Sequence, residues 1–197
     1  FIFREYYEPF LNFGHEIFDK KFNFIDVGCS RGFFSMYLLS LKNFRSNGLC
    51  IDPLKGALDD FVEILKINKV NRAKIIHGVI SNISKKKIEI FRANDLHGYY
   101  SIIKDIDFVD KRISNKFKIN SYTIDELIFE KKKLKSVDFI KIDAEGAEYE
   151  ILSKCNKTIK KFKPVIYCEI IRNQGKIFSF LKKKGYKLFS IDENKIV

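Results

Sequence analysis

With 197 residues, the chain is long enough for one domain with a sizeable hydrophobic core, and its 46% hydrophobic residues are normal for a globular protein. No apolar run approaches the roughly 20 residues of a transmembrane helix, and the first residues lack the pattern of a signal peptide. We therefore expect a cytoplasmic protein without a membrane span. Because the first residue is not Met, a preceding targeting segment stays open.

The formal net charge of +12 would suit a polyanion such as nucleic acid. The lysines are spread over short runs that we expect to form solvated surfaces, so nucleic-acid binding is the less favoured interpretation. The cysteines, which show no Cys-x-x-Cys spacing and lie in or beside apolar segments, are Cys29, Cys50, Cys155 and Cys168. This pattern favours buried, reduced thiols over disulfides or a zinc site.

Residues 1–20 are rich in aromatic side chains at partly helical spacing, and Pro9 interrupts the pattern. We expect an N-terminal helical segment that packs on the core or covers a ligand cleft. The remainder, residues 21–197, contains no linker or repeat and is predicted to form a single domain.

Strands and helices alternate in the first part of that domain. The predicted strands are 22–27, 49–51 and 74–77, and the predicted helices are 33–44 and 54–66. Asn47 and Gly48 are expected to end the first helix unit, as a glycine C-cap does. This βαβαβ order predicts a parallel sheet with right-handed crossovers.

The pattern changes between residues 86 and 120, where two predicted strands, 88–91 and 117–119, have no periodic helix between them. We expect a β-hairpin-like insertion there. The long connection 92–116 holds His97, Tyr99 and Tyr100, and connections of that length are usually functional or mobile.

Alternation resumes in the last third of the chain. The predicted elements are helix 123–132, strand 137–142, helix 145–156, strand 164–169, helix 175–184, strand 186–191 and a possible final strand from residue 195. The whole pattern indicates an α/β fold with a doubly wound, mostly parallel sheet.

The turn after the first strand reads Asp26-Val27-Gly28-Cys29-Ser30-Arg31-Gly32. Its Asp-x-Gly-x-x-x-Gly spacing differs from the dinucleotide fingerprint, and an acid suits a cationic ligand better than a pyrophosphate. Asp52 follows the next strand, at the spacing of an acid that binds ribose hydroxyls. Together these residues predict a site for S-adenosylmethionine (AdoMet), whose sulfonium and ammonium groups are cationic.

Further polar residues end the predicted parallel strands and should meet at one edge of the sheet. The strand-end residues are Asp26, Asp52, His77, Asp143 and Glu169. A single acid at a strand end is often a helix N-cap, but several converging on one edge favour a ligand site.

The segment from Asp138 to Glu148 resembles the fourth-strand motif of the FkbM family of AdoMet-dependent methyltransferases. The glycine turn, Asp52-Pro53, the Thr123–Leu127 segment and the Pro164–Glu169 strand also resemble motifs of that family. The departure is Cys29-Ser30-Arg31, which places a long cation beside the cofactor turn where the family usually has Ala-Asn-x.

The resemblance implies a Rossmann-like class I fold with seven strands in the order 3-2-1-4-5-7-6, and O-methylation of a sugar, glycan or small-molecule hydroxyl. The predicted cofactor-binding residues are Asp26, Gly28, Cys29, Ser30, Gly32, Asp52, Pro53, Gly78 and Val79.

The catalytic candidates surround the end of the fourth strand. Asp143 is the first candidate to remove the acceptor proton, to orient the acceptor, or to bind Mg²⁺ together with Glu169. Lys141 is expected to be buried and paired with an acid. Glu145 is either catalytic or lies in the first turn of a helix, where its negative charge interacts favourably with the helix dipole. His97 is a further candidate base.

Two other functions stay open. The net charge allows a ribose 2′-O-methyltransferase acting on RNA, and a non-catalytic protein that binds AdoMet or its product is the third possibility.

Overall fold

A computed structural model describes residues 21–41, 45–93, 100–102, 113–192 and 195–196. The predicted helical segment of residues 1–20 lies outside them. No helix in this described part is long and apolar enough to cross a membrane.

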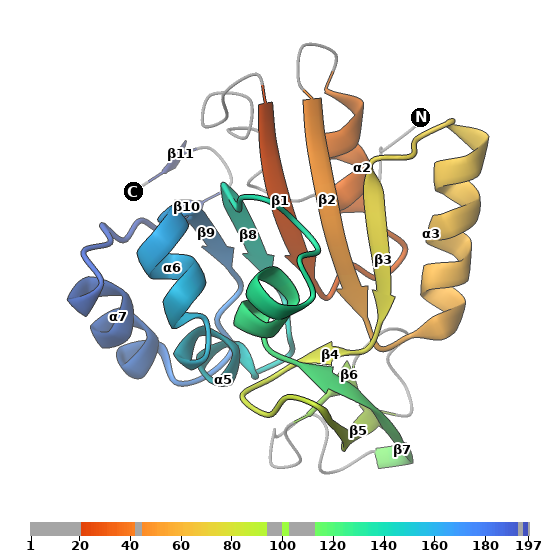
Figure 1. Cartoon of the computed structure of the whole chain (residues 1–197). Helices are drawn as coiled ribbons and strands as arrows, with labels where there is room; N and C mark the ends of the chain where they lie inside the picture. Colours follow the sequence, from red (N-terminus) through yellow and green to blue (C-terminus); the bar gives the residue numbers. More distant parts are fainter. Residues whose placement is uncertain (1–20, 42–44, 94–99, 103–112, 193–194, 197) are drawn as a thin grey trace.

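The main sheet has five described strands, all parallel, in the order β3-β2-β1-β8-β9 (Figure 1). Their bounds are Lys21–Val27 (β1), Arg45–Asp52 (β2), Ala73–His77 (β3), Phe139–Ile142 (β8) and Val165–Cys168 (β9). The predicted α/β architecture with a mostly parallel sheet is confirmed, and strand β1 lies at its centre.

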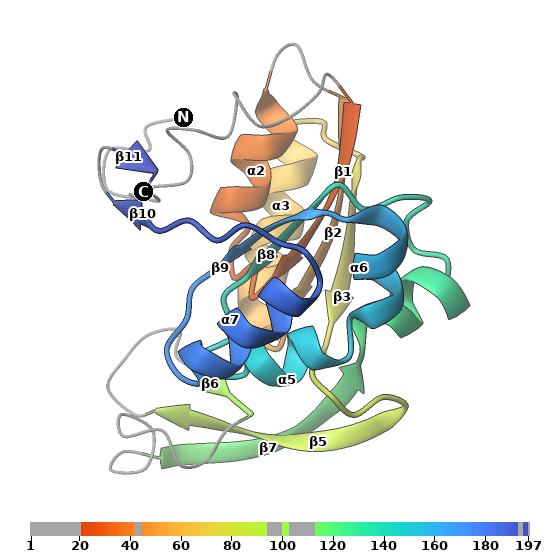
Figure 2. The same ribbon diagram turned by 90° about the vertical axis from the view of Figure 1, so that its left-hand side faces the viewer.

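Helices cover both faces of this sheet, because successive apolar residues of β1 point to opposite sides (Figure 2). Phe24 packs against helices α2 and α3, whereas Ile25 belongs to the core formed with η2, α5, α6 and α7. The helix bounds are Phe33–Ser40 (α2), Lys55–Ile67 (α3), Glu126–Glu130 (η2, a π-helical turn), Glu148–Ser153 (α5), Asn156–Phe162 (α6) and Gln174–Lys183 (α7).

A second sheet lies beyond the carboxyl ends of the main strands (Figure 1). Its strands, in the order β4-β7-β5-β6, are Val79–Ile80 (β4), Lys86–Ala93 (β5), Tyr100–Ser101 (β6) and Ile113–Tyr122 (β7). Strands β5 and β7 pair antiparallel, with Ile90 opposite Phe117. The hairpin-like insertion predicted around residues 86–120 is therefore confirmed.

The predicted glycine cap at Gly48 is wrong, because Gly48 lies inside β2 beside Phe24 of β1. A Cβ at Gly48 would lie 2.6 Å from Cζ of Phe24, so the missing side chain makes room for that ring. Helix α2 already ends at Ser40, four residues before the predicted end.

Two predictions for the last third of the chain are also corrected. The predicted helix 145–156 is shorter, since α5 begins only at Glu148, after the left-handed backbone of Glu145 with φ of 50°, and ends at Ser153. Helix α6, which was not predicted, begins at Asn156. Residues 186–190 form no strand, and a short β10 (Ile191–Asp192) pairs with β11 (Lys195–Ile196) instead. In the described residues the main sheet thus has five strands rather than the seven that the resemblance implied.

Candidate active site

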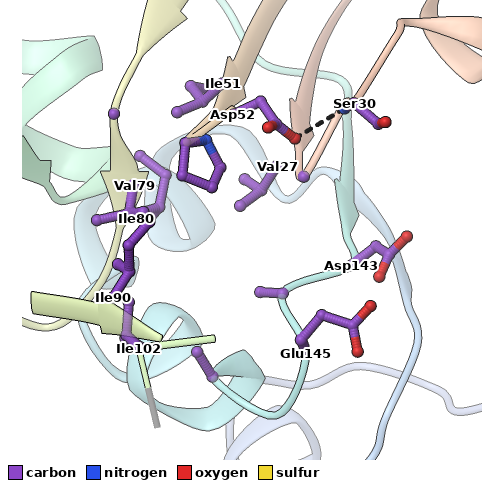
Figure 3. A pocket seen from close by; sticks show the side chains of 15 residues that line it. Val27, Ser30, Ile51, Asp52, Val79, Ile80, Ile90, Ile102, Asp143 and Glu145 are labelled. Atoms are coloured by element: carbon purple, nitrogen blue, oxygen red, sulfur yellow. Dashed lines mark hydrogen bonds between the residues drawn. The ribbon is translucent and has the colours of Figure 1, made fainter. Parts of the chain in front are cut away.

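A pocket opens between the carboxyl ends of the main strands and the second sheet (Figure 3). It is lined by Val27, Gly28, Ser30, Ile51, Asp52, Pro53, Gly78, Val79, Ile80, Ile90, Ile102, Asp143, Ala144, Glu145 and Ala147. The structure therefore brings together most of the cofactor-binding residues predicted from sequence, together with two of the catalytic candidates.

The glycine turn forms one wall of the pocket. Gly28 has φ of 77°, in the left-handed region that favours glycine, and a Cβ there would overlap the backbone carbonyl of Asp143. The backbone N–H of Asp143 in turn donates to the carbonyl of Val27 at 3.1 Å. The first-strand and fourth-strand motifs are thus in direct contact at the pocket floor.

Asp52 presents a carboxylate that the backbone holds in place. It accepts hydrogen bonds from the N–H groups of Ser30 and Leu54, both at 2.8 Å, one at each oxygen. Burial raises the pKa of Asp52 to about 6, although these two hydrogen bonds favour its charged form. A carboxylate fixed in this way still has lone pairs for hydroxyl donors of a ligand.

Asp143 and Glu145 supply two more carboxylates on the opposite side of the pocket (Figure 3). Burial raises the pKa of Glu145 to about 8, and the nearby charges of Asp143 and Glu169 add to that rise. Asp143 accepts a hydrogen bond of 3.1 Å from the ammonium group of Lys141, which is not among the residues that line the pocket.

The turn that carries Glu145 is held by side chains from two other segments. The N–H of Gly146 donates to Oε1 of Glu148 at 2.7 Å, and its carbonyl accepts from Nε of Arg172 at 2.6 Å. Arg172 also pairs with Glu150 at 2.9 Å. Both backbone polar groups of Gly146 therefore have side-chain partners.

An apolar wall faces these acids, and sequence reasoning missed it (Figure 3). Val79 and Ile80 come from β4, Ile90 comes from β5, and Ile102 directly follows β6. The alternation of Ile88 and Ile90 along β5 was the available signal, because it shows that one face of the insertion is buried.

Several predicted site residues do not line the pocket. Cys29 is buried in the core, and Gly32 starts helix α2 against the ring of Phe61. Glu169 is exposed, and His97 lies outside the described residues. Arg31, the departure from the family pattern, pairs with Asp60 of α3 at 2.9 Å on the surface.

Asp26 and Lys141 lie beneath the pocket rather than in it. Asp26 is fully buried, accepts a 2.6 Å hydrogen bond from Ser35 of α2 and is not among the residues that line the pocket. Lys141 is 4% exposed, with its ammonium 3.9 Å from Asp26 and 3.1 Å from Asp143. The predicted ion pair of the buried lysine is confirmed.

The predicted Mg²⁺ site requires several side chains that can ligate a metal ion close together. Within the described ranges, no group of three or more His, Cys, Asp or Glu side chains is placed to hold a metal ion. The proposed Mg²⁺ ligands Asp143 and Glu169 thus gain no support from the geometry.

Comparisons with known proteins identify the family of the chain. The methyltransferase FkbM domain matches residues 26–188. Among solved structures, methyltransferase FkbM from Methylobacillus flagellatus KT is similar, with a TM-score of 0.55 and 18% identity over 81% of this chain and 36% of that one. Precorrin-6y C5,15-methyltransferase from Geobacter metallireducens GS-15 has a TM-score of 0.54 and 12% identity, over 92% of this chain and 73% of that one.

At these identities the structural likeness shows a shared fold, and the chain spans only 36% of the length of the Methylobacillus protein. A comparison with curated protein sequences found no match. The domain match, by contrast, covers most of the chain and includes the glycine turn, Asp52, Asp143 and Glu145. The chain therefore belongs to the methyltransferase FkbM domain family.

Proposed function

We propose that the chain is an AdoMet-dependent O-methyltransferase whose acceptor is a hydroxyl of a sugar, glycan or small molecule. The observation that carries this proposal is the pocket itself, in which the fixed carboxylate of Asp52, the glycine turn and the acids Asp143 and Glu145 face one space. The family membership supports methyl transfer, and the O-methylation and the acceptor class are proposed here.

The residues present fit AdoMet part by part. Asp52 would accept hydrogen bonds from the ribose hydroxyls, since its oxygens are already oriented by Ser30 and Leu54. The apolar side chains of Pro53, Val79 and Ile80 would contact the adenine ring.

The charge of the pocket fits the other end of AdoMet. Asp143, and Glu145 once the pH exceeds its pKa of about 8, would carry the negative charge that a sulfonium and an ammonium group require. No cationic side chain is among the described residues that line the pocket. Asp26 would act indirectly, through the position of Lys141 behind Asp143.

AdoMet supplies an electrophilic methyl group when it is bound. The chain must align an acceptor hydroxyl with that methyl and take up the hydroxyl proton. Asp143 is our proposed proton acceptor, because it directly follows β8, lines the pocket and accepts a hydrogen bond from Lys141. The apolar wall of Ile90 and Ile102 would exclude water from the opposite side.

The test is incubation with AdoMet labelled in its methyl group and a panel of glycans, small hydroxyl compounds, nucleosides, cap analogues and RNA, with Mg²⁺ or with EDTA. We expect label in a glycan or small-molecule hydroxyl. Label that enters only RNA would favour the ribose 2′-O reaction, and loss of transfer in EDTA would revive the Mg²⁺ site at Asp143 and Glu169. No transfer and no AdoMet binding would overturn the proposal.

A further inference from the structure

One of the fourth-strand motif residues that line the pocket, Glu145, has an unfavourable backbone. Glu145 has φ of 50°, and a residue with a Cβ pays roughly 1 kcal/mol or more in that region. Without contacts that hold it, we expect this turn to relax toward negative φ and the Glu145 side chain to leave the pocket wall. The contacts that hold the turn therefore help to keep Glu145 at the pocket.

Those groups converge on Gly146, the next residue. Oε1 of the fully buried Glu148 accepts from its N–H at 2.7 Å, and Nε of Arg172 donates to its carbonyl at 2.6 Å. The Glu148 contact is local, since the residue is only two positions away. Arg172 is different, because it lies between β9 and α7 and ties the turn to a distant segment.

Arg172 is itself oriented by a second contact. Its Nη2 lies 2.9 Å from Oε1 of Glu150 on α5, so the guanidinium bridges the turn and the helix that follows it. The planar guanidinium suits this task, because its donors point in fixed directions and one side chain can serve two acceptors. Lys in its place would offer a single flexible ammonium.

We infer that Arg172 is a positioning residue for the active site, which keeps the Glu145 carboxylate in the AdoMet pocket through the backbone of Gly146. This inference rests on the proposed function, since it takes the cationic part of AdoMet as the group that Glu145 faces. Arg172 does not line the pocket, so its effect on the ligand is indirect.

The test uses two probes that differ in charge at sulfur, AdoMet and S-adenosylhomocysteine, with affinities measured by calorimetry above the pKa of about 8 of Glu145. Glu145→Gln and Arg172→Met should each lower the ratio of AdoMet affinity to S-adenosylhomocysteine affinity by roughly fivefold, because one unit charge near the sulfonium is lost or displaced. The double variant should show no further drop, since both changes remove the same interaction.

Arg72→Met is the matched control. Arg72 also donates to two backbone carbonyls, those of Ser46 and Leu39, at 2.9 and 2.8 Å. Neither Arg72 nor these two partners line the pocket. A purely structural role of Arg172 predicts the same outcome as for Arg72, with both affinities changed in parallel. Should Arg172→Met not fold, Arg172→Lys takes its place, with a smaller expected drop in the ratio.

Three results would count against the inference. They are an unchanged ratio in the Arg172 variants, a ratio that also falls in Arg72→Met, and fully additive effects of the Arg172 and Glu145 changes. With AdoMet binding intact in the wild type, each overturns the role of Arg172 alone. No AdoMet binding by the folded wild type would instead overturn the proposed function, and the inference with it.

Discussion

Gly28 and Asp143 are separated by more than a hundred residues of sequence, yet no side chain fits between them. The carbonyl of Asp143 occupies the space where a Cβ on Gly28 would stand. Since Asp143 also donates to the carbonyl of Val27, the end of β8 is fixed against the turn that follows β1. The position of the acid at the pocket therefore depends on the absence of a side chain at Gly28.

A Gly28→Ala substitution should unfold or strongly destabilise the protein. It combines φ of 77° with a backbone overlap, so we expect a loss of at least about 3 kcal/mol in the free energy of unfolding. Gly56→Ala is the control, because nothing lies within 4 Å of the Cβ position of Gly56 in helix α3. This substitution should raise the free energy of unfolding by at most about 1 kcal/mol. Urea denaturation of both variants measures the difference, and equal effects would refute the steric explanation.

Binding of S-adenosylhomocysteine should weaken in acid because of Asp52. Its pKa is raised to about 6 by burial, so it is neutral below that pH and a carboxylate above it. Ribose hydroxyls favour the carboxylate as acceptor. Affinity should therefore fall by up to about tenfold per pH unit once the pH is below 6.

Calorimetry between about pH 5 and pH 8 measures this dependence. Asp52→Asn should bind more weakly at neutral pH and lose the decline below pH 6, since the amide does not titrate. A wild-type affinity that stays level through pH 6, or an Asn variant with the same decline, would show that another group is responsible.

Asp125→Ala should destabilise the fold without changing the pocket. The Asp125 carboxylate accepts from the N–H groups of Lys157 and Thr158 and from the Thr158 hydroxyl, all within 2.8 Å, and so caps the start of α6. Losing such a cap costs about 1–2 kcal/mol. Thermal unfolding should show that loss with unchanged AdoMet affinity, whereas lowered affinity would place Asp125 in the site.

Lys141→Met should cost about 3 kcal/mol, because it removes a buried cation from between two acids. Adding Asp26→Asn to the Lys141→Met variant should recover part of the lost stability, since it removes one of the two negative charges that the lysine no longer pairs. Lys55→Met serves as comparison, because its pair with Asp59 is exposed and is worth less than about 1 kcal/mol. Equal losses at the two lysines in chemical denaturation would contradict the buried-pair assignment.

Local sequence patterns predicted the parts of this molecule in which neighbours along the chain decide the structure. The glycine turn, Asp52 at the end of β2, and Lys141 paired within a buried strand all follow from spacing and alternation. Gly48 was misassigned as a helix cap, because the ring that leaves no room for a side chain there belongs to Phe24 on another strand.

The pocket needed tertiary information in the same way. Glu145 has a left-handed backbone, and the next residue, Gly146, accepts a hydrogen bond from Arg172, which follows Glu145 by 27 positions. No local pattern shows this contact. The isoleucine wall depends on where the second sheet lies against the main one. Both features become visible only when distant segments are placed side by side.

Calorimetric titration of the purified chain with AdoMet measures whether the pocket between Asp52 and Glu145 binds this cofactor. We expect one site per chain, with affinity lowered at least about tenfold in Asp52→Ala, since removing a carboxylate that accepts ligand hydrogen bonds costs about 1.5–3 kcal/mol. A folded wild-type chain that does not bind AdoMet, or binds it equally well after Asp52→Ala, would contradict this expectation.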